Sequence, residues 1–384
     1  MKQGYFLLLL VVTLLCSCKD RYYPNIDSIN TNYLVVEGTL ISGNATTNLQ
    51  LSRTTPLNGS KGLLPEANAT VTVEGSDNSV KNLTMGNAGN YQGVLDLSSG
   101  NRYRVRIRIS GGKEYLSDFV PVKTTPEIDS IGFKQSDKGV QLYVNTHDAS
   151  NSTVYYRWDY DETWEIRSAY YSGLIYDAAS KDSDPFGVRR RRFPQEEVFY
   201  CWKYGKSSNI YIGSSAKLTS DVIYQQPLNL IPSGNERLSV KYSILLRQYA
   251  MDKAAYEFYD LMKKNTESIG DIFGPLPSEL RGNMHCVSDP KEIVIGYISA
   301  TEPKQKRIFI DSPAGWAFQQ YCVTNFVIMN ADSTREAFAT GAAIPIDYTS
   351  RAEDKADGYL SSSATCIDCR TRGGNTQRPA YWPQ

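Results

Sequence analysis

Four carboxylates lie close together near the middle of the chain and are the first candidates for chemistry. They are Asp159, Asp161, Glu162 and Glu165. Clustered carboxylate oxygens are the ligands that Ca²⁺ prefers, and paired carboxylates carry out glycoside hydrolysis. The same residues alternate with Trp158, Tyr160 and Trp164, a period-two pattern that is typical of a strand. The strand is the simplest interpretation, with the carboxylates in solvent or paired with arginines. The metal and catalytic alternatives stay open.

A run of arginines forms a second candidate site. It comprises Arg189, Arg190, Arg191 and Arg192. Consecutive guanidinium groups suit docking on anionic headgroups or on an acidic loop of a partner protein. The alternative is a loop whose charge is neutralised by acids nearby in the sequence. These acids are Asp182, Asp184, Glu196 and Glu197.

The cysteines could carry redox chemistry, bind zinc or form disulfides. Five follow residue 18: Cys201, Cys286, Cys322, Cys366 and Cys369. Because five is odd, at least one thiol stays free or pairs with another chain. Cys366 and Cys369 have CxxC spacing, but a redox motif needs a thioredoxin-like context and a zinc site needs a second ligand pair. A structural disulfide from Cys322 to either Cys366 or Cys369 is the simplest interpretation, and we predict it.

The composition narrows the function classes. The 384 residues include 41 Lys+Arg and 41 Asp+Glu, and this zero net charge argues against nucleic-acid binding. The chain has only two His, which argues against a His-based triad or a His-rich metal site. No GxSxG, HExxH, P-loop or dinucleotide-binding glycine motif occurs in the required context. We therefore expect no catalysis, no bound metal and no cofactor.

The N-terminus has the pattern of a lipoprotein signal. Lys2 precedes an apolar run over residues 6–15, which is shorter than the roughly 20 residues that span a bilayer. The run ends in Leu15-Cys16-Ser17-Cys18, which resembles the lipobox of bacterial lipoproteins. We predict a signal peptide over residues 1–17, lipidation of Cys18 and a tether over residues 18–33. A plain signal peptide that is cut near Ser17 is the alternative.

Period-two patterns dominate the first third of the chain. In residues 102–108, Tyr103, Val105 and Ile107 point one way and four arginines point the other. Short strands between Gly/Asn turns, together with 27 Tyr residues, favour β-structure. We predict a mainly β protein. Its residues 34–123 form an N-terminal β-sandwich that resembles the prealbumin-like or carboxypeptidase-regulatory type.

A Pro-containing linker at 121–126 precedes a second β-rich domain, which we predict over residues 124–346 and which is similar to a fibronectin-III sandwich. A long insertion at about 165–215 interrupts it. One amphipathic helix is predicted at about 252–265, because Ala254, Phe258 and Leu261 form an apolar stripe and Asp252 can serve as the N-cap. Residues 347–384 are polar and Gly-rich, and we predict an irregular, Cys-containing tail.

Short motifs recur in a fixed order through nearly the whole mature chain. They include LVVEG at 34–38, TWE at 163–165, AYEF at 255–258, KRIFI at 306–310 and CIDCR at 366–370. Together they resemble the Bacteroidetes outer-membrane lipoprotein family called domain of unknown function 4249. That family has no established catalytic residues. Its members are commonly encoded beside TonB-dependent outer-membrane transporters. The Lys19-Asp20 start of the mature chain partly resembles the surface-export signal of Bacteroidetes lipoproteins.

The resemblance implies a lipid-anchored outer-membrane protein, expected at the cell surface, that serves a TonB-dependent transporter as an accessory binding subunit in nutrient uptake. A structural or assembly lipoprotein without a small ligand is the alternative, and an extracellular enzyme acting on glycan or peptide is a third. We predict that the aromatic and basic segment between Tyr155 and Trp202 forms the partner-facing surface, because exposed aromatic and arginine side chains often carry interface energy. Arg189, Arg190, Arg191 and Arg192 would form its rim. Tyr170, Tyr171 and Trp202 would supply contacts, although aromatic residues also fill sandwich cores.

Overall fold

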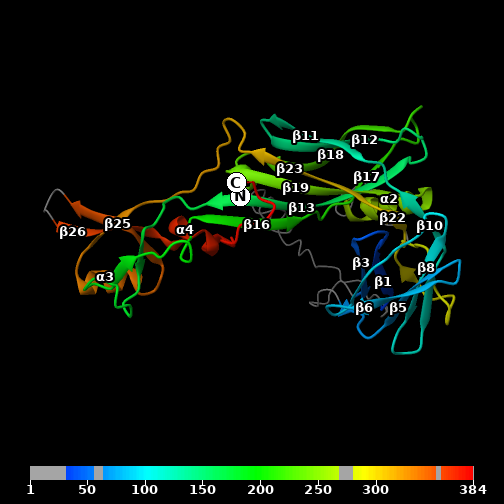
Figure 1. Cartoon of the computed structure of the whole chain (residues 1–384), viewed down its shortest axis with the longest axis horizontal. Coiled ribbons are helices and arrows are strands. Elements are labelled where there is room, and N and C mark those ends of the chain that lie inside the picture. The colour runs from blue at the N-terminus through cyan, green and yellow to red at the C-terminus, as the bar shows by residue number, and fades with distance from the viewer. Residues whose placement is uncertain (1–31, 56–63, 268–279, 352–355, 384) are drawn as a thin grey trace, which may run out of the picture.

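The computed structural model describes residues 32–55, 64–267, 280–351 and 356–383. The predicted signal peptide over 1–17, the lipidation site Cys18 and nearly all of the tether over 18–33 lie outside these residues. The described residues are mainly β, as the sequence predicts. None of the helices in these ranges is both long and apolar enough to cross a membrane. Three modules are joined along the length of the molecule (Figure 1).

The N-terminal module is a set of short strands around one apolar core (Figure 1). Its strands from the first third of the chain are β1 (Leu34–Gly38), β2 (Leu40–Ile41), β3 (Thr46–Arg53), β4 (Leu64–Pro65), β5 (Thr70–Gly75), β6 (Val80–Met85), β7 (Asn90–Val94), β8 (Arg102–Arg108), β9 (Glu114–Ser117) and β10 (Val120–Thr124). In β8, Tyr103, Val105 and Ile107 are buried as predicted. On the opposite, arginine face of β8, Arg104 and Arg106 both form ion pairs with Glu74.

Three later strands complete this module, so its boundary differs from the predicted range of 34–123. They are β20 (Met284–Cys286), β21 (Val294–Ile295) and β22 (Ala300–Glu302). β21 pairs in parallel with β1, and β22 pairs in parallel with both β2 and β10. A period-two pattern predicts a strand but does not identify its partner. The prediction from local sequence therefore assigned these three strands to the second domain, over residues 124–346, and this assignment is wrong.

The central module is a sandwich of two sheets. One sheet contains β11 (Ile128–Ser136), β12 (Gly139–His147) and β18 (Val222–Pro232); the other contains β13 (Tyr155–Arg167), β16 (Tyr200–Lys206), β17 (Tyr211–Ser214), β19 (Lys241–Ala250) and β23 (Lys304–Asp311). Side chains from both sheets, including Val144, Trp158 and Leu246, form one core. The second sheet turns its other face outward, and we call this the outer face. It carries the odd-numbered residues of β13, because side chains alternate along a strand.

The predicted amphipathic helix is α2 (Lys253–Glu267). The Asp252 carboxylate caps its N-terminus by accepting a hydrogen bond from the Ala255 N–H at 2.7 Å. The helix buries Ala255 and Phe258 against Ile212 and Tyr297. It therefore packs between the central and N-terminal modules (Figure 1).

The middle of the predicted insertion and the described residues between Cys322 and Arg372 fold together into a third module, which we call the distal module and which lies at the end of the molecule opposite the N-terminal module (Figure 1). The predicted insertion of about 165–215 is too long, because β16 and β17 within that range belong to the central sheet. Its elements are β14 (Leu174–Tyr176), β15 (Val188–Arg190), β24 (Asn325–Ile328), α3 (Ala331–Phe338), β25 (Ala343–Arg351), β26 (Ala356–Ser363), α4 (Ala364–Ile367) and the 3₁₀ turn η2 (Cys369–Arg372). Leu174, Val188, Phe338 and Tyr359 form its core. The prediction of an irregular tail over 347–384 is wrong for these strands. Their apolar partners lie about 170 residues earlier in the chain, so no local pattern reveals them.

Two disulfides fasten the distal module. Cys322 bonds to Cys366, which confirms the predicted link between Cys322 and the CxxC pair. Cys369 bonds instead to Cys201 of β16, so the two cysteines of the CxxC motif belong to different bridges. Cys286 is the free cysteine within the described ranges, and it is buried.

Candidate functional site

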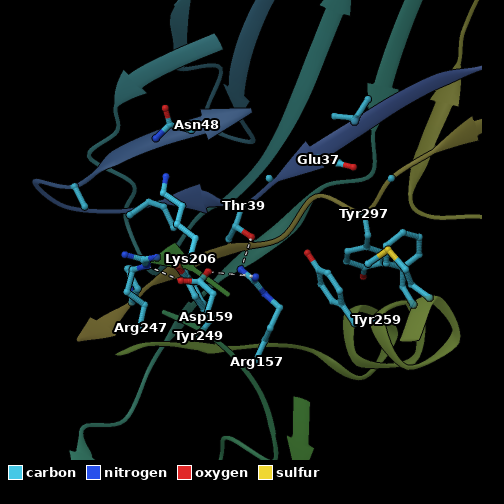
Figure 2. Close-up of a pocket in the computed structure, with 18 of the residues that line it drawn as sticks. Glu37, Thr39, Asn48, Arg157, Asp159, Lys206, Arg247, Tyr249, Tyr259 and Tyr297 are labelled. Carbon is cyan, nitrogen blue, oxygen red and sulfur yellow. Dashed lines mark hydrogen bonds and ion pairs between the residues drawn. The ribbon is translucent and has the colours of Figure 1, made fainter. Parts of the chain in front are cut away.

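A cleft of about 690 Å³ separates the N-terminal module from the outer face of the central sheet (Figure 2). One wall is built from β1, β2 and the loop before β3, and includes Glu37 and Thr39. The other wall is built from β13, β16, β19 and α2. Two side-by-side strands, β10 and β22, run from the N-terminal module into the central module.

Charged side chains form a continuous row along the central wall. Arg157, Asp159 and Asp161 alternate along β13 and therefore share the outer face. Arg247 of β19 lies opposite Asp159 in register. Its guanidinium donates from Nε to Asp159 Oδ1 and from Nη1 to Asp161 Oδ2, the second at 2.5 Å. Each carboxylate thus meets at least one arginine, and the row is electrically balanced.

Arg157 joins the charged row to an aromatic region (Figure 2). Its guanidinium carbon lies 4.2 Å from the centroid of the Tyr249 ring and 5.2 Å from that of Tyr259. Such cation–π contacts hold the planar group in place. Its Nη2 donates a long hydrogen bond of 3.4 Å to Thr39 Oγ1 across the cleft. Burial, followed by the charge of Asp159, raises the pKa of Tyr249 to about 12.

Asp161 combines a fixed charge with an unused acceptor. Burial raises the pKa of Asp161, but the hydrogen bond from Arg247 and the charges of Arg247, Lys206 and Arg307 outweigh it, so the net pKa lies below the ordinary value. The carboxylate is therefore ionised at neutral pH. Its Oδ1 atom is buried and has no hydrogen-bond partner among the described residues. A buried acceptor of this kind is costly unless something donates to it.

The structure confirms the strand interpretation of the four carboxylates. Asp159 and Asp161 line the cleft in their pairs with Arg247. Glu162 points into the sandwich core, where the Tyr242 hydroxyl donates to it at 2.9 Å. Glu165 accepts from the indole N–H of Trp382. Within the described ranges, no group of three or more His, Cys, Asp or Glu side chains could hold a metal ion.

The predicted arginine rim is wrong for two of its four members. Arg189 and Arg191 are only 6% and 8% exposed, while Arg190 and Arg192 are exposed. Arg189 binds Glu196 through two parallel hydrogen bonds of 2.9 and 2.7 Å. Neutralisation by local acids, the simpler interpretation, therefore holds for Arg189 and Arg192. Among the aromatic candidates, Tyr171 is 51% exposed, Tyr170 is half-buried and Trp202 is buried at 7%.

We expect the Arg189–Glu196 pair to make the distal module acid-sensitive. The hydrogen bonds from Arg189 lower the pKa of Glu196 to about 2. Because the folded pKa is depressed, the stabilisation is complete above the ordinary pKa of about 4.5 and is lost as the pH falls towards 2. Arg189→Ser should lower the unfolding free energy by about 2 kcal/mol at pH 7 and flatten its pH dependence. Thermal denaturation from pH 7 to pH 3 measures both effects.

Arg192→Ser is the matched control, because Arg192 pairs with Asp182 while both side chains are more than 60% exposed. It should change the thermal midpoint little at any pH, since exposed pairs contribute little. Equal effects of the two substitutions would contradict the structural role assigned to Arg189.

Sequence reasoning missed the cleft, although part of its signal was present. The alternation of Arg157, Asp159 and Asp161 was visible in the sequence. Arg247 and Tyr249 alternate in the same way on a later strand. What local patterns do not show is that β13 and β19 pair in the register that sets Asp159 opposite Arg247. They also do not show that β1 faces this row.

Comparisons with known proteins place the chain in a family without assigning it an activity. No curated protein matches the chain. A solved structure from Corynebacterium diphtheriae, described as a membrane anchored protein, matches with 10% identity and a TM-score of 0.16 over 58% of this chain. The match spans 55% of that chain, so this protein corresponds to little more than half of it. A family model matches residues 19–307, a range that includes every residue lining the cleft. The chain therefore belongs to the family described as Domain of unknown function (DUF4249).

Proposed function

We propose that this protein is a lipid-anchored binding protein of the outer membrane, without catalytic activity, whose cleft holds a ligand. We further propose that it serves a TonB-dependent transporter as an accessory binding subunit in nutrient uptake. The observation that carries the first proposal is the cleft of about 690 Å³ between two modules. Junctions between domains are common places for ligand sites, and this volume lies in the usual range for small molecules.

The electrostatics of the cleft support binding over catalysis. A general acid needs a carboxyl group whose pKa is raised towards neutrality. The pKa of Asp161 is lowered instead, and Arg247 donates hydrogen bonds to both Asp161 and Asp159. The two histidines lie outside the cleft and pair with surface acids, His147 with Asp129 and His285 with Asp118. The charged side chains of the cleft, Arg247, Asp159 and Asp161, are thus suited to orient a ligand.

The location and the partner rest on the sequence. Cys18 ends a lipobox-like motif, and the mature chain begins with charged residues. The resemblance to lipoproteins encoded beside TonB-dependent transporters supports the partner. The distal module is the natural candidate for the contact, because Tyr171 and Phe193 stack there with exposed rings. Exposed aromatic pairs of this kind suit protein interfaces.

Affinity purification from native outer membranes tests this function. The tagged full-length protein should co-purify with a TonB-dependent transporter after mild solubilisation. Tyr171→Ser combined with Phe193→Ser should reduce that recovery severalfold, because the stacked pair is lost. Tyr224→Ser, at a side chain that is 75% exposed on the central module, is the control and should leave recovery unchanged. Co-purification with envelope assembly machinery alone would overturn the uptake role.

A further inference from the structure

The outer face of the central sheet continues beyond the cleft towards the C-terminal residues. In register, Asp161 lies between Lys206 of β16 and Leu245 of β19, and Leu245 lies beside Arg307 of β23. We call this set of four residues the floor row. Lys206 and Asp161 also line the cleft, so the floor row extends it across the width of the sheet.

Two tyrosines border the floor row on the side away from the N-terminal module. Tyr204 lies two residues before Lys206 on the same face of β16 and is 54% exposed. Tyr381 comes from the C-terminal segment and is 43% exposed. Its hydroxyl lies 2.8 Å from Thr163 Oγ1, and its ring centroid lies 3.8 Å from the Arg307 guanidinium carbon. Burial and the proximity of Tyr381 both raise the pKa of Tyr204, which agrees with the two tyrosines lying close together.

The hydrogen-bonding groups of the floor row are complementary to a ligand that both donates and accepts hydrogen bonds. Asp161 is an ionised acceptor whose side chain is 36% exposed, and a carboxylate can accept several hydrogen bonds. Lys206, next to it in register, presents an exposed ammonium group that can only donate. A hydroxyl group can donate to the first and accept from the second. Within the cleft the charges balance, since Glu37, Asp159 and Asp161 lie together with Arg157, Lys206 and Arg247. Arg307 of the floor row adds one positive charge, and its guanidinium packs on the Tyr381 ring.

We propose that the cleft and its floor row bind a neutral oligosaccharide, an inference that rests on the proposed binding function. Sugar hydroxyls satisfy Asp161 and Lys206, and the apolar face of a sugar ring stacks on Tyr204 or Tyr381. An ionic ligand would have to compete with the Arg247 pairs that already neutralise the wall. An extended peptide usually binds a sheet edge, where backbone groups are free. Here the ligand meets the face of the sheet.

The first experiment identifies the ligand class. The full-length lipoprotein, in a detergent that contains no sugar, is applied to an array of neutral, sulfated and uronic-acid glycans and to a tryptic digest of casein. We expect binding to one group of neutral glycans. Absence of glycan binding, preference for the charged glycans, or binding of casein peptides alone would each overturn the proposal.

The second experiment places the sugar, with titration calorimetry on the best neutral glycan of the array. Tyr204→Ala should weaken binding about tenfold, because one stacking surface is lost. Tyr224→Ala, at a more exposed tyrosine on the other sheet, is the matched control and should leave affinity unchanged. Ala45→Trp fills the cleft from an exposed loop position and should abolish binding, whereas Ala216→Trp, at an exposed position outside the cleft, should not.

These outcomes separate the proposal from the function on which it rests. A casein peptide that binds, and that Ala45→Trp excludes, would overturn the sugar and keep the binding cleft. A neutral glycan whose affinity is unchanged by both Tyr204→Ala and Ala45→Trp would overturn the placement of the sugar. Recovery of the transporter from native membranes is measured independently of both.

Discussion

Combining Cys201→Ser with Cys369→Ser is expected to lower the unfolding free energy of the protein by about 5 kcal/mol, the largest change of any substitution considered. The disulfide joins residues that are 168 positions apart in the sequence. For a loop of that length, the chain-entropy model gives a stabilisation of about 5 kcal/mol. Both cysteines are fully buried beside Ile166, so their loss also disturbs packing. The double substitution avoids leaving an unpaired thiol. Thermal denaturation without reductant, followed by limited proteolysis, measures the effect.

Cys286→Ala provides the control for this experiment. Cys286 is buried but forms no disulfide, so Cys286→Ala removes a buried thiol without breaking a bridge and should cost about 1 kcal/mol. The double variant should melt at a much lower temperature than this control and should be cleaved first within the distal module. Equal melting of the double variant and the wild type would show that the Cys201–Cys369 bridge does not hold the distal module to the central sheet.

Cys18→Ala is expected to convert the protein from a membrane-bound to a released form. The apolar run over residues 6–15 is removed with the predicted signal peptide, so the lipid on Cys18 is the expected anchor. Fractionation of cells after a carbonate wash should place the wild type in the membrane pellet and the variant in the supernatant. Cys16→Ala is the control and should remain in the pellet. A variant at Cys18 that stays fully in the pellet would contradict lipid anchoring.

Local patterns predicted the elements far better than the way they assemble. Three elements are present as predicted: the strand over residues 102–108, the strand through Trp158 and the helix after Asp252. Each depends on residues that lie only a few positions apart in the sequence. The distal module depends on contacts between Leu174 and Phe338, which lie far apart in the sequence. No periodicity encodes such a contact, so the tail seemed irregular.

The same limit explains what happened to the candidate sites. The spacing of the carboxylates at 159 and 161 suggests ligands of a metal. Their partner Arg247 lies on another strand, and its ion pairs make them members of a charged row instead. The arginine run looked like a docking surface because four charges are adjacent. The fold instead buries Arg189 and Arg191, with Arg189 paired to Glu196, and leaves only Arg190 and Arg192 exposed. Charge in a sequence predicts an interaction, and only the fold determines its partner.

Methyl NMR of the full-length protein shows directly whether a ligand occupies the cleft. Ile41, Met262 and Ile295 line the cleft, whereas Ile328 and Met329 belong to the distal module. Titration with the best glycan from the array should shift the methyl signals of the first three residues in a saturable manner and leave the other two unchanged. Saturable shifts at Ile328 and Met329, with Ile41, Met262 and Ile295 unmoved, would contradict ligand binding in the cleft.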